Sequence, residues 1–374
     1  MALTRPLRLK SEVAKLRPEA SSSTLPVARV WVDSGVFHLD QHFDYLVPDN
    51  LSPLVKIGIR VQVPFHGREI EALVIARIAE SDSPVLKSIT KVLSPHSVAT
   101  TESLSLIEAA AHRWAAHPYD ILRSAIPPRV ASVDKENFNV SDPRINVGKV
   151  KRTYIQIPPV ANRFEFIATL VRNSSIKGSS LIVVPDSRSA HYLHSLVKDS
   201  ILLDSTLERA ERYRNFLQIR NGRDLIVIGT RSAIFAPIAD LSSIIVIDEG
   251  SESHYEPRTP GWNVRDVAIL RSMQSNLSLS FVGYSPSSEA ARLIETKWMD
   301  YSASKSRLNV SAFAQIHGEL LPSRLMSEIR KAMKVGPILF LSPRKGYSQA
   351  ITCSKCRNVA LCSCGGKLTQ KSNH

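Results

Sequence analysis

The sequence predicts a multidomain α/β protein in which a small β domain precedes a doubly wound parallel sheet. Residues 27–95 are rich in β-branched residues and contain alternating apolar and polar positions, which is typical of strands. From about residue 153, short apolar strands alternate with helical stretches, which is typical of a parallel sheet covered on both faces. With 374 residues, the chain is also too long for one ordinary domain.

The first part of the chain is predicted to form three segments. Residues 1–26 are a basic lead-in without an apolar signal core, which we expect to be disordered. The β domain occupies residues 27–97, where "VARVWV", "GIRVQVPF" and "IEALVIARI" are separated by glycines and prolines. A helical segment follows at 98–130, because apolar residues such as Leu104 and Ile107 recur at helical spacing. A polar linker then runs to about residue 150.

The parallel region is predicted at 151–300, and residues 301–374 begin a further unit. Three apolar strands are predicted from "SSLIVVPD", "DLIVIGT" and "SSIIVID", and the last of them ends at Asp248 and Glu249. A carboxylate at the C-terminal end of a parallel strand is where a nucleotide-driven motor holds Mg²⁺. This strand therefore raises the hypothesis of an NTPase.

The sequence contains no phosphate-binding loop of the form G-x-x-x-x-G-K-[ST]. "VGKV", "NSSIKGSS" and "GGKLT" each lack the hydroxyl residue or the order of glycine and lysine that the loop needs. The segment ahead of "SSLIVVPD" is also predicted to be too short for a strand, a loop and a helix. A carboxylate pair without a phosphate-binding loop is a weak site for Mg²⁺·ATP, so we expect neither Mg²⁺ nor ATP to bind as a cofactor.

The charge of the chain indicates a polyanionic partner. An excess of 14 positive charges at pH 7 favours nucleic acid first and an anionic membrane surface second, with a merely solvated basic surface as the alternative. No apolar run reaches the roughly 18–20 residues that span a bilayer. We expect a cytoplasmic protein, associated with the nucleoid and not with a membrane.

Five segments of the sequence follow one another in order: "VARVWVD…HFDYLVPDNL…GIRVQVPFHG", "RWAAHPYDILRSAIPPR", "LIVVPDSRSA", "DLIVIGTRSAIFAPIADLSSIIVIDEGSESHYE" with "VRDVAILRS" and "FVGYSPSSEAARL", and "LFLSPRKGYSQAITCSKCRNVALCSCGGKLT". Together they resemble the PriA family of primosomal replication-restart proteins. The resemblance implies a 3′-end-binding β domain, a winged-helix-like segment at 98–130, a RecA-like helicase lobe and part of a zinc-binding insertion. It also implies binding of branched DNA with 3′ ends and the recruitment of replication-restart and single-strand-binding proteins.

Several departures from the family pattern bear on activity. The family's phosphate loop is missing, the histidine of its Asp-Glu-x-His box is replaced by Ser251, and its Ser-Ala-Thr motif is replaced by "GYSPSS". The chain is also predicted to end inside the zinc insertion. This pattern resembles the actinobacterial branch of the family. These departures imply that Asp248 and Glu249 are the remnant of a hydrolysis strand and that no residue is catalytic. We expect a DNA-binding restart factor without helicase activity. The alternatives are an ATP-dependent 3′–5′ helicase with an unrecognised nucleotide site and a truncated, non-functional fragment.

The resemblance also implies DNA-binding residues. Phe43 would stack on a terminal base and Asp44 would accept a hydrogen bond from the 3′-OH, unless the first is core and the second a turn residue. Gly67 would allow close approach of the backbone, and Lys87 would contact a phosphate. The resemblance also implies that Arg231 faces DNA and that Tyr255 and Trp262 either stack on bases or pack beneath a loop. Three further arginines flank the helical segment and either contact a duplex backbone or simply lie on the surface: Arg113, Arg123 and Arg129.

The four cysteines are Cys353, Cys356, Cys362 and Cys364. Their clustering in a cytosolic protein favours metal over disulfides, and four thiolates suffice for tetrahedral zinc. The first pair has the usual knuckle spacing, whereas the second is one residue short of it. The alternative is a zinc site that is broken because its later cysteines are missing.

Overall fold

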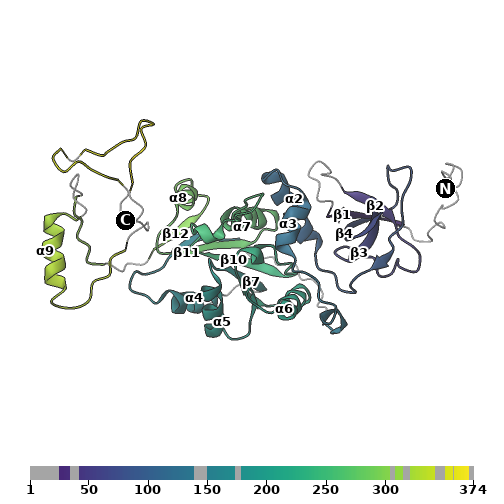
Figure 1. Cartoon of the computed structure of the whole chain (residues 1–374). Helices are drawn as coiled ribbons and strands as arrows, with labels where there is room; N and C mark the ends of the chain where they lie inside the picture. The colour runs from purple at the N-terminus through teal and green to yellow at the C-terminus, as the bar shows by residue number, and fades with distance from the viewer. Residues whose placement is uncertain are drawn as a thin grey trace. The chain divides into compact units, whose positions relative to one another are not determined.

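A computed structural model of the chain describes residues 25–33, 42–138, 150–172, 178–303, 308–314, 321–341, 350–356 and 358–369 (Figure 1). The basic lead-in, apart from its last two residues, and most of the linker lie outside this part. Contacts divide the chain into two units, residues 1–306 and 307–374. In the described part, no helix is both long and apolar enough to cross a membrane.

The predicted β domain is a five-stranded antiparallel sheet in the order β2-β1-β4-β3-β5. Its strands are β1 (Val27–Val32), β2 (Phe43–Leu46), β3 (Arg60–Phe65), β4 (Arg68–Ile78) and β5 (Lys91–Val92). Alternation works as expected, because Val61 and Val63 of β3 are fully buried while Gln62 between them is half-buried. These valines join a core of aliphatic side chains from all the longer strands.

Two helices follow where the sequence predicts one helical segment with a winged-helix-like fold. They are α2 (Thr101–Arg113), capped by Thr100, and α3 (Pro118–Ala125), which begins with a proline where a missing N–H is harmless. Only a short 3₁₀ helix, η1 (Val133–Lys135), is found after them, and residues 98–138 contain no strand. The wing that the prediction requires is therefore not present in this segment.

The larger sheet has seven parallel strands in the order β12-β6-β11-β10-β7-β9-β8. Its strands are β6 (Arg152–Gln156), β7 (Ser179–Val183), β8 (Ser200–Leu203), β9 (Ile226–Gly229), β10 (Leu241–Ile247), β11 (Ser278–Gly283) and β12 (Asp300–Ser302). Its helices are α4 (Arg163–Arg172), α5 (Ser187–Leu196), α6 (Arg209–Asn221), α7 (Val264–Gln274) and α8 (Ser288–Glu295), with 3₁₀ turns η2 (Arg231–Phe235) and η3 (Glu252–His254).

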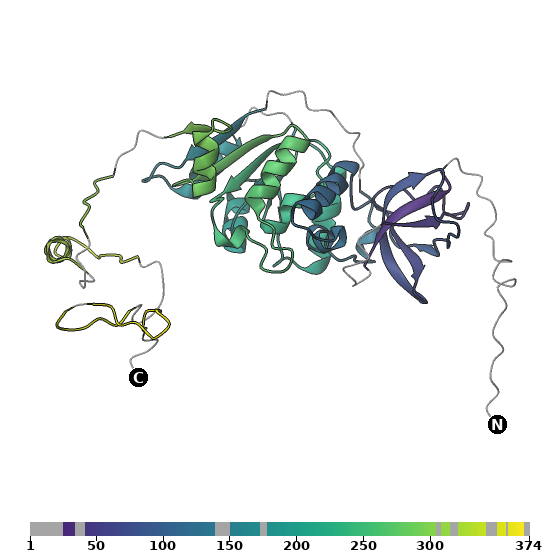
Figure 2. The same ribbon diagram turned by 90° about the horizontal axis from the view of Figure 1, so that it is seen from above.

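Both faces of this sheet are covered, as predicted. Helices α4 and α5 pack on one face around Ile182 and Ile245, and α7 packs on the other around Val246 (Figures 1 and 2). The helices α2 and α3 also join the second core, together with Trp31 and Leu73 of the β domain. The β domain and the parallel sheet therefore belong to one compact unit.

One prediction about this sheet is wrong. The segment before β7 is long enough for a complete strand–loop–helix unit, namely β6, residues 157–162 and α4. The unit was not predicted because its loop, "IPPVAN", has two prolines and lacks the glycine that a phosphate-binding loop would contain. The edge strands β8 and β12 were also not predicted, since each has only three or four residues.

The second unit contains one described helix, α9 (Ser323–Ala332), and none of its residues is buried. The cysteine-rich segment forms two short antiparallel bridges, Thr352 with Val359 and Leu361 with Lys367. Each bridge encloses one pair of cysteines.

Candidate nucleic-acid interface

A pocket of about 560 Å³ opens at the end of the β domain where β2 begins. Phe43, Asp44 and Lys87, which the sequence singles out from two distant segments, all line it. Lys87 is brought there by the backbone, because its carbonyl oxygen accepts a hydrogen bond from the N–H of Leu46 at 2.9 Å. The structure thus assembles three of the four predicted 3′-end residues around one cavity.

The carboxylate of Asp44 is held by two side chains that the sequence did not reveal. Arg29 lies directly opposite it on β1 and donates two hydrogen bonds, from Nε to Oδ1 at 2.9 Å and from Nη2 to Oδ2 at 3.1 Å. The hydroxyl of Ser81 donates to Oδ2 at 2.6 Å. Burial works to raise the pKa of Asp44, but the bonds from Arg29 and Ser81 outweigh it and lower the pKa below its ordinary value. Asp44 is therefore an oriented anion on a strand and not a turn residue.

Aromatic rings form the other wall of the pocket. The ring of Phe43 meets the ring of Phe65 edge to face, with centroids 5.1 Å apart, and Phe65 meets His66 in the same way at 4.5 Å. Phe43 and Phe65 are only half-buried, so their rings remain accessible. Such a cluster offers a π face to an unpaired base.

Gly67 has a different role from the one predicted for it. His66 and Gly67 form the two-residue turn between β3 and β4, with φ angles of 44° and 78°. Two positive φ angles are what a tight hairpin turn requires, and glycine adopts them without strain. Gly67 does not line the pocket, whereas His66, which seemed an extra residue in the resemblance, does.

An arginine lies at the C-terminal end of β10, a central strand of the parallel sheet. Asp248, directly after β10, lies 2.6 Å from Nη1 of Arg163, the first residue of α4. Burial raises the pKa of Asp248, even though Arg163 works in the opposite direction. The loop ahead of α4 contains Pro158 and Pro159, which have no N–H to offer a phosphate. The position that Mg²⁺ would need beside Asp248 is thus taken by a guanidinium, so the residues present do not fit Mg²⁺·ATP.

Glu249 is turned inward and is 1% exposed. Its Oε1 accepts a hydrogen bond from the N–H of Ser287 at 2.9 Å, and its Oε2 has no partner among the described residues. His254 is fully buried behind the strand, and its Nε2 bonds to the carbonyl of Ile247 at 2.8 Å. Burial lowers the pKa of His254, so this histidine is neutral and serves the packing of the loop.

The remaining predicted residues, Arg231, Tyr255 and Trp262, lie in or beside the loop that follows β10, and they differ in exposure. Arg231 pairs with Glu256 at 3.1 Å and donates to the carbonyls of Ser253 and Tyr255, so it holds the loop. Tyr255 is 53% exposed and shares a pocket with Arg231. Trp262 is 0% exposed and packs edge to face on Phe235; of the two roles open to it, it has the packing role.

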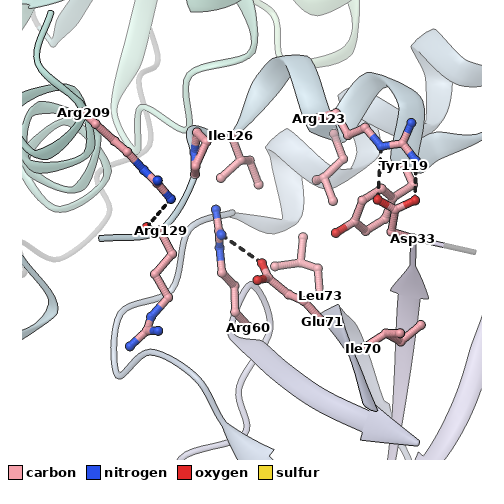
Figure 3. A pocket seen from close by; sticks show the side chains of 12 residues that line it. Asp33, Arg60, Ile70, Glu71, Leu73, Tyr119, Arg123, Ile126, Arg129 and Arg209 are labelled. Atoms are coloured by element: carbon pink, nitrogen blue, oxygen red, sulfur yellow. Dashed lines mark hydrogen bonds and ion pairs between the residues drawn. The ribbon is translucent and has the colours of Figure 1, made fainter. Parts of the chain in front are cut away.

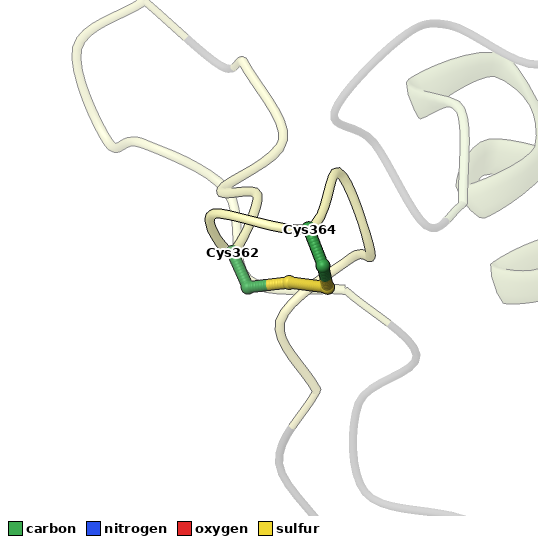
Figure 4. Close-up of a disulfide and its surroundings, with 2 residues drawn as sticks. All are labelled: Cys362 and Cys364. Atoms are coloured by element: carbon green, nitrogen blue, oxygen red, sulfur yellow. A yellow bond between two sulfur atoms is a disulfide. The ribbon is translucent and has the colours of Figure 1, made fainter.

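The cysteines do not form a single site. Cys362 and Cys364 are joined by a disulfide (Figure 4), whereas Cys353 and Cys356 are free and exposed. In the part of the chain that the structure describes, no three Cys, His, Asp or Glu side chains are grouped closely enough to hold one metal ion. Hydrogen bonds from the backbone of Cys356 and Lys355 lower the pKa of Cys353, as suits a thiolate ligand. With Cys362 and Cys364 joined, only Cys353 and Cys356 remain as free thiol ligands, and the zinc site stays a prediction.

The β domain and its two helices match a known domain. Residues 29–127, from β1 to just beyond α3, match the family profile described as the 3′DNA-binding domain (3'BD) of PriA. The probable replication restart protein PriA of Mycobacterium tuberculosis (strain ATCC 25618 / H37Rv) is 33% identical over 89% of this chain and 58% of its own length. The chain thus contains a PriA-type 3′DNA-binding domain and is similar to PriA along most of its length.

Other PriA proteins are also similar to the chain along most of its length. The protein of Mycobacterium leprae (strain TN) is 31% identical over 89% of this chain and 59% of its own, and that of Treponema pallidum (strain Nichols) is 25% identical over 88% and 56%. The chain thus spans somewhat more than half the length of these relatives. Among solved structures, RecG bound to a three-way DNA junction has 15% identity and a TM-score of 0.33, covering 62% of this chain and 33% of that one, which is too low to support an argument.

Proposed function

We propose that this chain is a PriA-family DNA-binding replication-restart factor that recognises 3′ ends at branched DNA and does so without hydrolysing ATP. The observation that carries the proposal is the pocket in which an oriented carboxylate, an aromatic wall and two cations lie together. It lies within the residues that match the family's 3′DNA-binding domain. Replication-restart and single-strand-binding proteins are the partners that we propose for the assembled complex.

The chemistry of the pocket matches each part of a terminal nucleotide. The rings of Phe43 and Phe65 provide a surface for the base, which every base can use because each has a π face. Asp44 keeps one acceptor position on Oδ1 that neither Arg29 nor Ser81 occupies, and a 3′-OH can donate to it. A strand that continues past this position has no hydroxyl to donate and places a phosphate against the carboxylate instead.

The first prediction concerns this hydrogen bond. Asp44→Ala should weaken binding to a fork with a free 3′-OH by about tenfold to a hundredfold, because a hydrogen bond to a charged group is worth about 1.5–3 kcal/mol. A fork with a 3′-phosphate should bind poorly to the wild type and lose little more. Since Asp44 also pairs with Arg29, the substitution should lower the melting temperature as well. The deciding quantity is therefore the ratio of the two affinities, which a loss of stability does not change.

The aromatic wall has a matched control. Phe43 and Tyr192 are each half-exposed or exposed rings that meet a phenylalanine edge to face, at 5.1 Å and 4.9 Å, but Tyr192 lies on α5 outside the pocket. Phe43→Ala should weaken fork binding about fivefold or more, since stacking of one base is worth about 1–3 kcal/mol, and Tyr192→Ala should not. Fluorescence anisotropy with labelled forks measures both. Equal affinity of the wild type for 3′-OH and 3′-phosphate forks would overturn the proposal.

A further inference from the structure

A cleft of about 680 Å³ lies between the β domain, α3 and the start of α6 (Figure 3). It shares no lining residue with the 3′-end pocket. The charged and polar side chains that matter for its chemistry are Asp33, Arg60, Glu71, Tyr119, Arg123, Arg129 and Arg209. The sequence singles out Arg123 and Arg129 as residues that contact a duplex backbone or simply lie on the surface, and the structure brings both into this cleft.

The cleft is positively charged. Four arginines and two carboxylates line it, which leaves two positive charges in excess. Each carboxylate is already engaged, Asp33 by Arg123 and Glu71 by Arg60. Burial raises the pKa of Tyr119 to about 12, so the phenol adds no negative charge near neutral pH. Each carboxylate is thus paired with one arginine, and the positive charge of the other two arginines in the lining remains to attract an anion.

The side chain of Arg60, which lines the cleft, is held in one position by hydrogen bonds. It is only 7% exposed, and its guanidinium donates to Glu71 at 2.8 Å and to the carbonyl of Pro127 at 2.7 Å. A guanidinium has five N–H donors, so further donors remain for a ligand. Because its side chain is already fixed, binding would not have to order it.

Two further arginines line the cleft, and Figure 3 shows Arg209 reaching from α6 to the backbone of Arg129. Arg129 pairs with the buried Asp134, which does not line the cleft. Arg209 is exposed at the first position of α6 and donates to the backbone carbonyl of Arg129 at 3.1 Å. No carboxylate among the described residues forms an ion pair with Arg209. It is the cation with most freedom to bind a ligand.

The position of the cleft favours a polynucleotide over a small anion. Arg60 begins β3 and Phe65, in the wall of the 3′-end pocket, ends it. These two side chains point to opposite faces of the sheet, but Pro64 lies on the same face as Arg60 and also lines that pocket. Five residues of a strand span about 17 Å, which corresponds to roughly five nucleotide steps at about 3.4 Å each. Apolar side chains such as Leu73 and Leu122 lie among the arginines, and a sugar–phosphate backbone presents the same mixture of charge and apolar surface.

We propose that the arginine cleft binds the sugar–phosphate backbone of DNA, about five nucleotides from the 3′ end held in the pocket. The contact reads neither sequence nor the chemistry of the 3′ end, because phosphates position a protein without specifying bases. The distance from the 3′ end rests on the proposed function of the pocket, whereas the binding of phosphate by the cleft does not.

The test compares Arg209→Ala with Arg292→Ala. Arg292 is a suitable control because it is also an exposed arginine on a helix, 71% exposed on α8 and outside the cleft. Arg209→Ala should weaken binding of 3′-OH and 3′-phosphate forks alike, by about threefold to tenfold near 0.1 M salt, and should reduce the slope of log affinity against log salt by about 1. Arg292→Ala should change neither quantity, and thermal melts should coincide for all three proteins.

A change in the DNA provides the second arm. Neutral methylphosphonate linkages at the fourth to sixth positions from the 3′ end should weaken binding of the wild type by the same factor as Arg209→Ala. The same DNA should bind the variant no more weakly than unmodified DNA does, because the contact is already lost. Linkages placed elsewhere should weaken both proteins equally.

The outcomes separate the two proposals. If Arg209→Ala behaves as Arg292→Ala does in affinity and salt slope, the cleft proposal is overturned while the 3′-OH preference stands. If the wild type shows no 3′-OH preference and Arg209→Ala still reduces the salt slope, the pocket proposal fails and phosphate binding by the cleft stands. If Arg209→Ala weakens binding of an octa-aspartate peptide but not of DNA, the cleft is a peptide site and the proposal is overturned.

Discussion

The ion pair between Arg29 and Asp44 could not be predicted from the identity of either residue. The sequence gives both residues, 15 positions apart, but their pairing depends on the register of β1 against β2. A shift of one residue would place their side chains on opposite faces of the sheet. Phe43, Asp44 and Lys87 could be predicted from a resemblance, whereas Arg29, Phe65 and Ser81 needed the register and the loop geometry. A positive residue in one strand opposite a negative one in the next was the available signal.

The pH dependence of stability tests the environment of Asp248 at the C-terminal end of β10. Burial raises its pKa above the ordinary value of about 4, so the folded chain holds this proton more tightly than the unfolded one. Stability from this source is present below the unfolded pKa and is lost as pH rises through the folded pKa. Asp248→Asn removes this loss. The melting temperature of the variant relative to wild type should therefore rise as the pH increases from about 4, the ordinary pKa of an aspartate, through the raised pKa of Asp248.

The same substitution tests for nucleotide chemistry. With Arg163 beside Asp248 and prolines in the preceding loop, we expect no DNA-stimulated ATP hydrolysis by the wild type, and unchanged DNA binding by Asp248→Asn. Asp300→Asn, which removes an exposed carboxylate at the start of β12, is the control. ATPase activity that depends on DNA and disappears only with Asp248→Asn would show that the carboxylate serves a nucleotide.

At the scale of elements, the long apolar strands were predictable and the short ones were not. β10 has seven buried residues in succession, a pattern that is typical of a strand buried on both faces of a parallel sheet. By contrast, β6 exposes Arg152 and Thr153 in part and is followed by prolines, so its pattern resembles a linker. The helices α2 and α3 were predicted as one segment, but Ala115 with φ of 47° and Pro118 separate them. Their packing depends on partners far away in the sequence.

Arg271 is one such partner and leads to a prediction about element packing. It is 0% exposed on α7 and donates to both carboxylate oxygens of Glu102 on α2, at 3.0 Å and 3.2 Å, and to the carbonyls of Ile234 and Ala236. Arg271→Met leaves these acceptors without their donor and should destabilise the fold by about 3–5 kcal/mol.

The control for this prediction is Glu102→Gln. This substitution keeps an acceptor for Arg271 and should cost about 1 kcal/mol. Thermal or urea melts measure both losses. The ratio of 3′-OH to 3′-phosphate affinity should stay unchanged at temperatures where the proteins are folded, because neither residue lines the pocket. A changed ratio would mean that α2 and α7 affect recognition directly.

At the scale of the whole molecule, its two units have different means of stabilisation. The first has continuous cores in the β domain and on both faces of the parallel sheet. In the second, α9 has no buried residue, and large apolar side chains such as Leu339 and Phe340 are exposed. A segment with so little buried surface needs a crosslink or a metal to hold one conformation. The sequence could predict the need for such a tie from the cysteines, but not how they are connected.

The last prediction tests whether zinc or the disulfide stabilises the cysteine-rich segment. Each cysteine pair is enclosed by a short antiparallel bridge, and the lowered pKa of Cys353 favours the thiolate that zinc requires. Under reducing conditions, we expect about one zinc ion per chain by metal analysis. Chelation should then increase proteolytic cleavage within residues 350–369 and leave the main thermal transition unchanged, since the first unit has its own cores. Cys353→Ser should reproduce the effect of the chelator. Retention of the Cys362–Cys364 disulfide in reducing buffer, with no zinc found, would contradict the prediction.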